Sequence, residues 1–271
     1  MRSNTRRSNP APARRASLAA ALAVLAVLGA SGASAFAQGP YGKIKGTLIW
    51  GGAEAPAPKN LVEKGAATKD PGYCAKAEPI PDRSLTVDPT SKGVRYAFVY
   101  LVKPQGTNPD ALKAIVAKEP TVEVDQKNCE YVPYVVAMTE GQTVVFKSSD
   151  PVNHNIHAGG LNNSFNQILP PNGQMQMKVN IDDRRPTPLT CDLHPWMKGY
   201  LMVFSHPFFA VTGADGSFEI DGVPAGAQNL LIWQEKVGYV TPGGAKGMPV
   251  EVKAGATTDV GAVKLDPAKV K

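Results

Sequence analysis

The chain has few of the residues from which most catalytic and metal sites are built, with only 4 histidines and 3 cysteines. The cysteines are Cys74, Cys129 and Cys191, too few for a disulfide-rich scaffold. In an oxidising compartment two of them would pair and one would stay free, and the count does not say which. No Ser/His/Asp triad and no phosphate-binding loop is recognisable, so nothing indicates a serine hydrolase or a nucleotide-dependent enzyme.

Acidic residues are absent from residues 1–37, which contain five arginines. An apolar run follows from Leu18 to Leu28, and small residues lead to Ala35-Phe36-Ala37. This order is typical of a secretory signal peptide, which predicts a mature chain from Gln38 that is exported to the periplasm, the medium or the cell surface. An uncleaved anchor is the alternative. The pair Arg14-Arg15 leaves open whether the general or the twin-arginine route is used.

The mature chain has little net charge. Lys+Arg number 29 and Asp+Glu 23 in the full chain, and five of the basic residues belong to the leader. The basic pI therefore comes from the leader, and nothing indicates a nucleic-acid partner. Beyond the leader no apolar stretch approaches the roughly 20 residues of a transmembrane helix, so no integral membrane segment is expected after cleavage.

Short β-branched and aromatic runs, with 26 glycines and 24 prolines, predict an all-β, turn-rich protein. Strands are expected at Ile44–Trp50 and Val94–Val102, and an alternating, half-buried one at Met175–Ile181. Asn108-Pro109-Asp110 starts the one expected helix, which runs to about Lys118. We divide the chain into a signal peptide (1–37), an N-terminal β region with that helix (38–129) and two further domains (130–206 and 207–266).

The segment from Leu189 to Gly199 carries the clearest chemistry. It contains Cys191-x-x-His194-x-x-Met197, in a loop between two expected strands. A thiolate, an imidazole and a thioether form a soft ligand set that suits copper, and a weak axial methionine is typical of electron-transfer copper sites. Zinc fits poorly, because it does not use thioether ligands.

A trigonal copper site needs a second histidine from elsewhere in the chain. Two of the four histidines lie in Asn153-His154-Asn155-Ile156-His157, just after an expected strand. Residues three apart in an extended segment point to opposite faces, so only one of the two can face the site. His154 is the expected ligand and His157 the alternative.

Together, the segments 153–157 and 191–197 resemble the type 1 copper motif of cupredoxins, with amicyanin and plastocyanin the most similar members. The resemblance covers about residues 130–204. It implies a Greek-key β-sandwich that holds one copper ion through His154, Cys191, His194 and Met197. It also implies that Asn155 rigidifies the site by hydrogen bonding between the two ligand segments, and that His194 lies at the solvent edge.

Several consequences follow from the resemblance. A copper site needs Cys191 as a thiolate, which implies a Cys74–Cys129 disulfide; the alternatives are that Cys191 itself lies in a disulfide, or that Met197 only packs. Pro195 and Trp196 are expected to form an apolar surface on which redox partners dock. Because only His157 and His206 remain, the additional histidine ligands of a multicopper oxidase or a nitrite reductase are missing. The implied function is electron transfer without catalysis.

A second resemblance covers about residues 207–266. Phe209–Ile220 followed by Val223-Pro224-Ala225-Gly226 is similar to a carboxypeptidase-regulatory-like (prealbumin-like) β-sandwich, a module used as scaffold or for adhesion. Gly46–Trp50 has a similar opening, and the sequence leaves open which of the two sandwiches this strand joins. Two other functions stay open: a copper-binding or storage protein without redox partners, and a cell-surface or glycan-binding module with structural copper.

Overall fold

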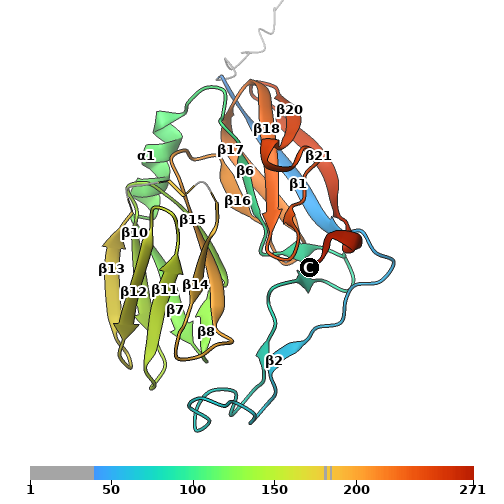
Figure 1. The fold of residues 1–271 in the computed structure, drawn as a ribbon. Coiled ribbons are helices and arrows are strands. Elements are labelled where there is room, and N and C mark those ends of the chain that lie inside the picture. The colour runs from blue at the N-terminus through green and yellow to red at the C-terminus, as the bar shows by residue number, and fades with distance from the viewer. Residues whose placement is uncertain (1–39, 180–181, 184) are drawn as a thin grey trace, which may run out of the picture. The chain divides into compact units, whose positions relative to one another are not determined.

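The structure, a computed structural model, describes residues 40–179, 182–183 and 185–271 (Figure 1). Within these ranges the chain forms 21 β-strands, one α-helix and two 3-10 helices, η1 (Gly244–Lys246) and η2 (Pro267–Lys269), which confirms the predicted all-β class. The predicted signal peptide and the last two residues of the predicted strand Met175–Ile181 lie outside them. Among the described residues, no helix has both the length and the apolar character needed to cross a membrane.

The first sandwich consists of a four-stranded and a five-stranded sheet, whose strand orders are β13-β10-β7-β8 and β12-β11-β14-β15-β9. The four-stranded sheet contains β7 (Thr121–Lys127), β8 (Glu130–Val132), β10 (Thr143–Ser148) and β13 (Gln174–Lys178). The five-stranded sheet contains β9 (Val135–Thr139), β11 (His154–Gly159), β12 (Ser164–Leu169), β14 (Thr187–Thr190) and β15 (Lys198–Phe204). The domain boundary expected from the sequence, between residues 129 and 130, falls in the turn that joins β7 to β8. Strand β7, which lies before that boundary, pairs with β8 and belongs to the first sandwich.

The second sandwich joins strands from both ends of the chain. One sheet has the order β17-β1-β21 and the other β16-β6-β18-β19, with β20 paired to β18. Its strands are β1 (Tyr41–Trp50), β6 (Phe98–Leu101), β16 (Phe209–Val211), β17 (Ser217–Pro224), β18 (Gly226–Gln234), β19 (Gly238–Tyr239), β20 (Met248–Val252) and β21 (Thr257–Leu265). In Figure 1 the blue strand β1 lies among red and orange strands. This pairing answers the question that the sequence left open.

Two short hairpins complete the sheets: β2 (Asn60–Val62) with β3 (Ile80–Pro81), and β4 (Thr86–Val87) with β5 (Val94–Arg95). The predicted continuous strand Val94–Val102 is wrong, because the chain breaks it between β5 and β6. Tyr96 has φ +67°, in the left-handed region, where a strand cannot continue.

The helix α1 (Pro109–Lys118) has the predicted bounds and cap. Oδ1 of Asn108 accepts a hydrogen bond from the backbone N–H of Ala111 at 3.0 Å, and Pro109 occupies the first turn, where it needs no donor. The amide of Asn108 also donates to the carbonyl of Gly222 in β17. The helix therefore makes the connection from β6 in the second sandwich to β7 in the first.

The core of the first sandwich extends beyond its own sheets. Large side chains such as Phe146, Ile156 and Leu189 are fully buried there, each worth roughly 1.5–3 kcal/mol of stabilisation. The same cluster includes Cys74 and Ala75, which lie in residues 63–79, the β2–β3 loop. A segment that precedes the sandwich by about fifty residues thus packs into its core, at the end that carries the candidate metal ligands.

Candidate metal centre

Cys191 and His194 lie in the loop that joins β14 to β15. These strands are antiparallel, and Thr190 pairs with Lys198, so the hydrogen-bonded ladder fixes both ends of the loop. Inside the loop, the N–H of Met197 donates to the carbonyl of His194 at 2.9 Å and closes a turn. Strand pairing at both ends and a hydrogen bond inside the loop therefore restrain this short segment, and a metal site needs its donor atoms restrained in this way.

His154 reaches the same point from the start of β11, the strand next to β14. Its Nδ1 lies 3.0 Å from Nδ1 of His194. Sγ of Cys191 lies 4.0 Å from Nδ1 of His154 and 3.6 Å from Nδ1 of His194. All three side chains are buried. The structure thus brings three of the predicted ligands together, with one donor atom of each facing the same small space.

The fourth predicted ligand, Met197, is 2% exposed and packs in the same core cluster as Cys191. This placement agrees with either an axial ligand or a packing residue, so its role stays a prediction. The alternative ligand His157 lies elsewhere. Its side chain is 46% exposed, and its Nδ1 is 2.9 Å from Oδ1 of Asp192. The opposite faces of β11 separate the two histidines, as the spacing indicates.

Each of the two buried imidazoles has a carboxylate at its outer nitrogen. Nε2 of His154 lies 2.9 Å from Oδ2 of Asp150, and Nε2 of His194 lies 2.8 Å from Oδ2 of Asp70. This geometry assigns the proton to Nε2 in the neutral rings and leaves the Nδ1 lone pairs directed at the space beside Cys191. Neither aspartate belongs to the ligand motif that is recognisable in the sequence.

Asp150 is fully buried and uses all of its acceptor capacity. Besides His154 it accepts hydrogen bonds from the backbone N–H groups of Asn128 and Cys129, at 2.7 and 2.8 Å, and from the hydroxyl of Tyr73 at 2.7 Å. Asn128 and Cys129 form the β7–β8 turn with φ of +57° and +59°, so that their successive N–H groups can share one anion. Burial alone would raise the pKa of Asp150, but these hydrogen bonds hold it below its ordinary value.

His154 and Cys191 shift each other's pKa. Burial acts to lower the pKa of His154, but the hydrogen bonds to Asp150 and Cys191 outweigh it and raise the pKa to about 9. Burial acts to raise the pKa of Cys191, but hydrogen bonds from His154, His194 and backbone N–H groups lower it to about 6. Near neutral pH the metal-free site therefore holds a Cys191 thiolate beside a protonated His154, and a metal that binds there displaces the Nδ1 proton of that ring.

Asn155 connects the two ligand segments. Its backbone N–H points at Sγ of Cys191 at 3.4 Å. Its side chain accepts from the N–H of Asp192 and donates to Oδ2 of Asp192 at 2.9 Å. Asn155 thus hydrogen-bonds the His154 segment to the Cys191 loop, and its role in making the metal site rigid stays a prediction.

The Cys74–Cys129 disulfide is present, and Cys191 is the free, buried cysteine. The disulfide links the β2–β3 loop to the β7–β8 turn. Its two sulfur atoms lie within 4.8 Å of a ring nitrogen of His194. The bridge is therefore a wall of the site and does not compete for the thiol that the site needs.

One expectation about His194 is wrong: it is not at the solvent edge. Its side chain is fully buried, since Asp70 of the β2–β3 loop lies at its outer nitrogen and the ring of Trp196 lies 5.4 Å from its own. The resemblance covers only residues 130–204, so it contained no information about a loop that arrives from residues 63–79.

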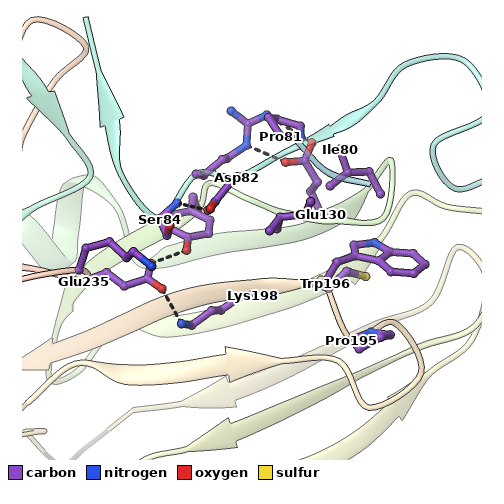
Figure 2. Close-up of a pocket in the computed structure, with 14 residues that line it drawn as sticks. Ile80, Pro81, Asp82, Ser84, Glu130, Pro195, Trp196, Lys198 and Glu235 are labelled. Atoms are coloured by element: carbon purple, nitrogen blue, oxygen red, sulfur yellow. Dashed lines mark hydrogen bonds and ion pairs between the residues drawn. The ribbon is translucent and has the colours of Figure 1, made fainter. Parts of the chain in front are cut away.

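Pro195 is exposed, whereas Trp196 is half-buried and donates from Nε1 to the carbonyl of Cys129 at 3.2 Å. Both residues line a cavity with Ile80 and Pro81 of β3 and with Glu235 (Figure 2). Two ion pairs, Arg83 with Glu130 and Lys198 with Glu235, stand in its walls. The surroundings of Trp196 are therefore more charged than the apolar surface expected from the sequence, and docking of a redox partner there stays a prediction.

The donor set fits copper. Two imidazole nitrogens and a thiolate sulfur of depressed pKa lie within one ion's reach of each other, and hydrogen bonds already hold the outer nitrogens. Within the described residues, the other groups of possible ligands share atoms with the disulfide or with Asp150. This leaves His154, Cys191 and His194 as the one complete set there.

No protein-family model matches the chain, and no curated protein matches it. Among solved structures, a purple cupredoxin from Nitrosopumilus maritimus is 21% identical over 31% of this chain and 99% of its own, with a TM-score of 0.27. A copper-containing nitrite reductase from Thermus scotoductus is 19% identical over 31% of this chain and 22% of its own, with a TM-score of 0.28. A Cu(I) amicyanin variant is 16% identical over 32% and 84%, with a TM-score of 0.28. At such low TM-scores these similarities add nothing to the geometry described above.

Proposed function

We propose that this chain is an exported type 1 copper protein that carries single electrons between protein redox partners. The observation that carries the proposal is the convergence of Nδ1 of His154, Nδ1 of His194 and Sγ of Cys191 at 3.0 to 4.0 Å from one another in a buried site. A copper ion held by these atoms would supply a one-electron couple, because imidazole suits both of its oxidation states and thiolate suits Cu(I).

The residues around the three donor atoms favour electron transfer over simple copper binding or storage. His154 is held from a strand and from Asp150, and Cys191 and His194 from a loop whose ends are paired. Donors that are fixed in this way move little when the charge of the site changes, which keeps the reorganisation energy small. Met197 is the proposed axial ligand and would tune the potential.

The compartment is part of the proposal. Residues 1–37 have the composition of a signal peptide, and the Cys74–Cys129 disulfide favours an oxidising environment. We interpret residues 207–266, with β1 and β6, as a carboxypeptidase-regulatory-like scaffold. Pro195 and Trp196 remain the proposed docking point for the redox partner.

A reversible redox titration of the copper-loaded mature chain tests this function. An electron carrier holds one copper per chain through repeated cycles and gives the same midpoint potential on reduction and on oxidation. A storage protein would release its copper on one arm of the cycle or bind more than one ion. A glycan-binding module with structural copper would bind glycans equally well with and without copper and would show no reversible couple.

A further inference from the structure

The β2–β3 loop is fixed at both ends and in its middle. Its base is the pairing of β2 with β3, and its far part is tied by the disulfide from Cys74 to Cys129 in the β7–β8 turn. Ala67, Cys74 and Ala75 are buried in the core cluster that also holds Cys191 and Met197. The loop therefore has a defined position against the metal centre.

The turn at residues 70–74 presents Asp70 to His194. The carbonyl of Asp70 accepts hydrogen bonds from the N–H groups of Tyr73 and Cys74, both at 2.9 Å, and Asp70 has φ +43°. Its Oδ2 lies 2.8 Å from Nε2 of His194. The Asp70 side chain is 46% exposed while that of His194 is 0% exposed, so this carboxylate stands between the imidazole and water.

The same turn also acts on the other imidazole. The hydroxyl of Tyr73 donates to Oδ1 of Asp150 at 2.7 Å, and Oδ2 of Asp150 lies 2.9 Å from Nε2 of His154. The sulfur of Cys74 lies within 4.8 Å of a His194 ring nitrogen. One turn from outside the sandwich thus supplies contacts to the outer side of both histidines.

We infer that Asp70 is a positioning residue of the metal centre, which fixes the ring of His194, closes its solvent edge and adds a negative charge there. This inference rests on the proposed copper function and deepens it. A carboxylate that accepts from the outer N–H makes the imidazole a stronger donor, and its charge favours Cu(II) over Cu(I). The covered edge also keeps small ligands in solution away from His194.

Two substitutions distinguish the effect of the negative charge of Asp70 from its effect in shielding His194 from solvent. Asp70→Asn removes the charge but keeps an oxygen that accepts from Nε2, so it should raise the midpoint potential. Mutation of such an outer partner typically changes metal affinity by about 10- to 100-fold. If the affinity for Cu(II) falls about tenfold relative to that for Cu(I), the midpoint potential rises by about 59 mV. Asp70→Ala opens the edge, so added imidazole should alter the Cu(II) electron paramagnetic resonance spectrum of this variant and leave that of the wild type unchanged.

Glu63→Gln is the matched control, because it removes the same charge from the same loop while its side chain bonds to Asn60 at 3.0 Å. We expect its potential and its insensitivity to imidazole to equal those of the wild type. Equal potentials for Asp70→Asn and Glu63→Gln would overturn the inference. If Asp70→Ala does not fold, Asp70→Asn alone decides the question.

A measurement on the metal-free protein tests the role of Asp70 independently of copper binding. There, the Nε2 proton of His194 should exchange slowly with solvent in the wild type and at least about tenfold faster in Asp70→Ala, by nitrogen-15 NMR of the histidine side chains. A wild type that binds no copper, together with this difference in exchange, would contradict the copper function and leave the role of Asp70 standing. Equal exchange in both proteins would contradict the role of Asp70 whatever the copper result.

Discussion

Asp150 lies four residues before His154, and its Oδ2 is 2.9 Å from Nε2 of that histidine, with both side chains fully buried. The pair is local in sequence, yet distant segments complete it. The β7–β8 turn donates two N–H groups to Asp150, and Tyr73 of the β2–β3 loop donates its hydroxyl. The orientation of the first candidate ligand therefore depends on three parts of the chain.

Asp150→Asn should weaken copper binding by about 10- to 100-fold, since outer partners of ligating histidines have effects of that size. An amide offers one acceptor where the carboxylate offers two, and its NH₂ group would face the N–H donors of the β7–β8 turn. Competition with a chelator of known affinity measures the loss. Asp183→Asn, at another buried aspartate that hydrogen-bonds Thr187 at the start of β14, should bind copper as the wild type does.

The two histidines of β11 should respond in opposite ways to removal. His154→Ala should abolish the thiolate-to-copper absorption, because it deletes one of three converging donors. His157→Ala should keep it, because His157 is half-exposed and bonded to Asp192. Visible spectra of the two variants under equal copper loading check this, and a blue His154→Ala protein would show that His154 is not a ligand.

Replacing both Cys74 and Cys129 by alanine should lower the free energy of unfolding by about 2–5 kcal/mol, the usual effect of losing a disulfide, and should leave the blue colour. Denaturant unfolding curves of the variant and the wild type, each fitted with its own m-value, give the difference in the free energy of unfolding. A midpoint equal to that of the wild type would mean that the packing of the β2–β3 loop, and not the bridge, holds that loop in place.

Met197→Leu should keep the copper and raise the midpoint potential, since it removes a weak electron donor and leaves a residue of similar volume in the core. Titration against redox mediators gives the potential. An unchanged potential would favour the packing interpretation of Met197, and complete loss of copper would make it a stronger ligand than an axial methionine.

Local patterns were enough to predict several elements. The helix was predicted with its cap, because Asn108 and Pro109 act on the backbone next to them. The ligand motif 191–197 was also visible, because three donors lie on one short loop. By contrast, the break at Tyr96 carries no signal, since a tyrosine at positive φ looks like any strand tyrosine in the sequence.

The features that close the site were not predictable from one sequence. Asp70 lies 124 positions from His194, and only the path of the β2–β3 loop brings them together. The disulfide was the one available hint, because pairing Cys74 with Cys129 carries residues near Cys74 to the β7–β8 turn. Strand β21 was missed as well, because its exposed, polar positions lack the apolar run that marks other strands.

The visible spectrum of the mature chain, expressed from Gln38 and loaded with Cu(II), tests the central claim most directly when it is recorded beside Cys191→Ser. We expect an intense visible thiolate-to-copper absorption in the wild type, which ascorbate bleaches and reoxidation restores, and no such absorption in the variant. A colourless wild-type protein without bound copper, or a variant that stays blue, would contradict it.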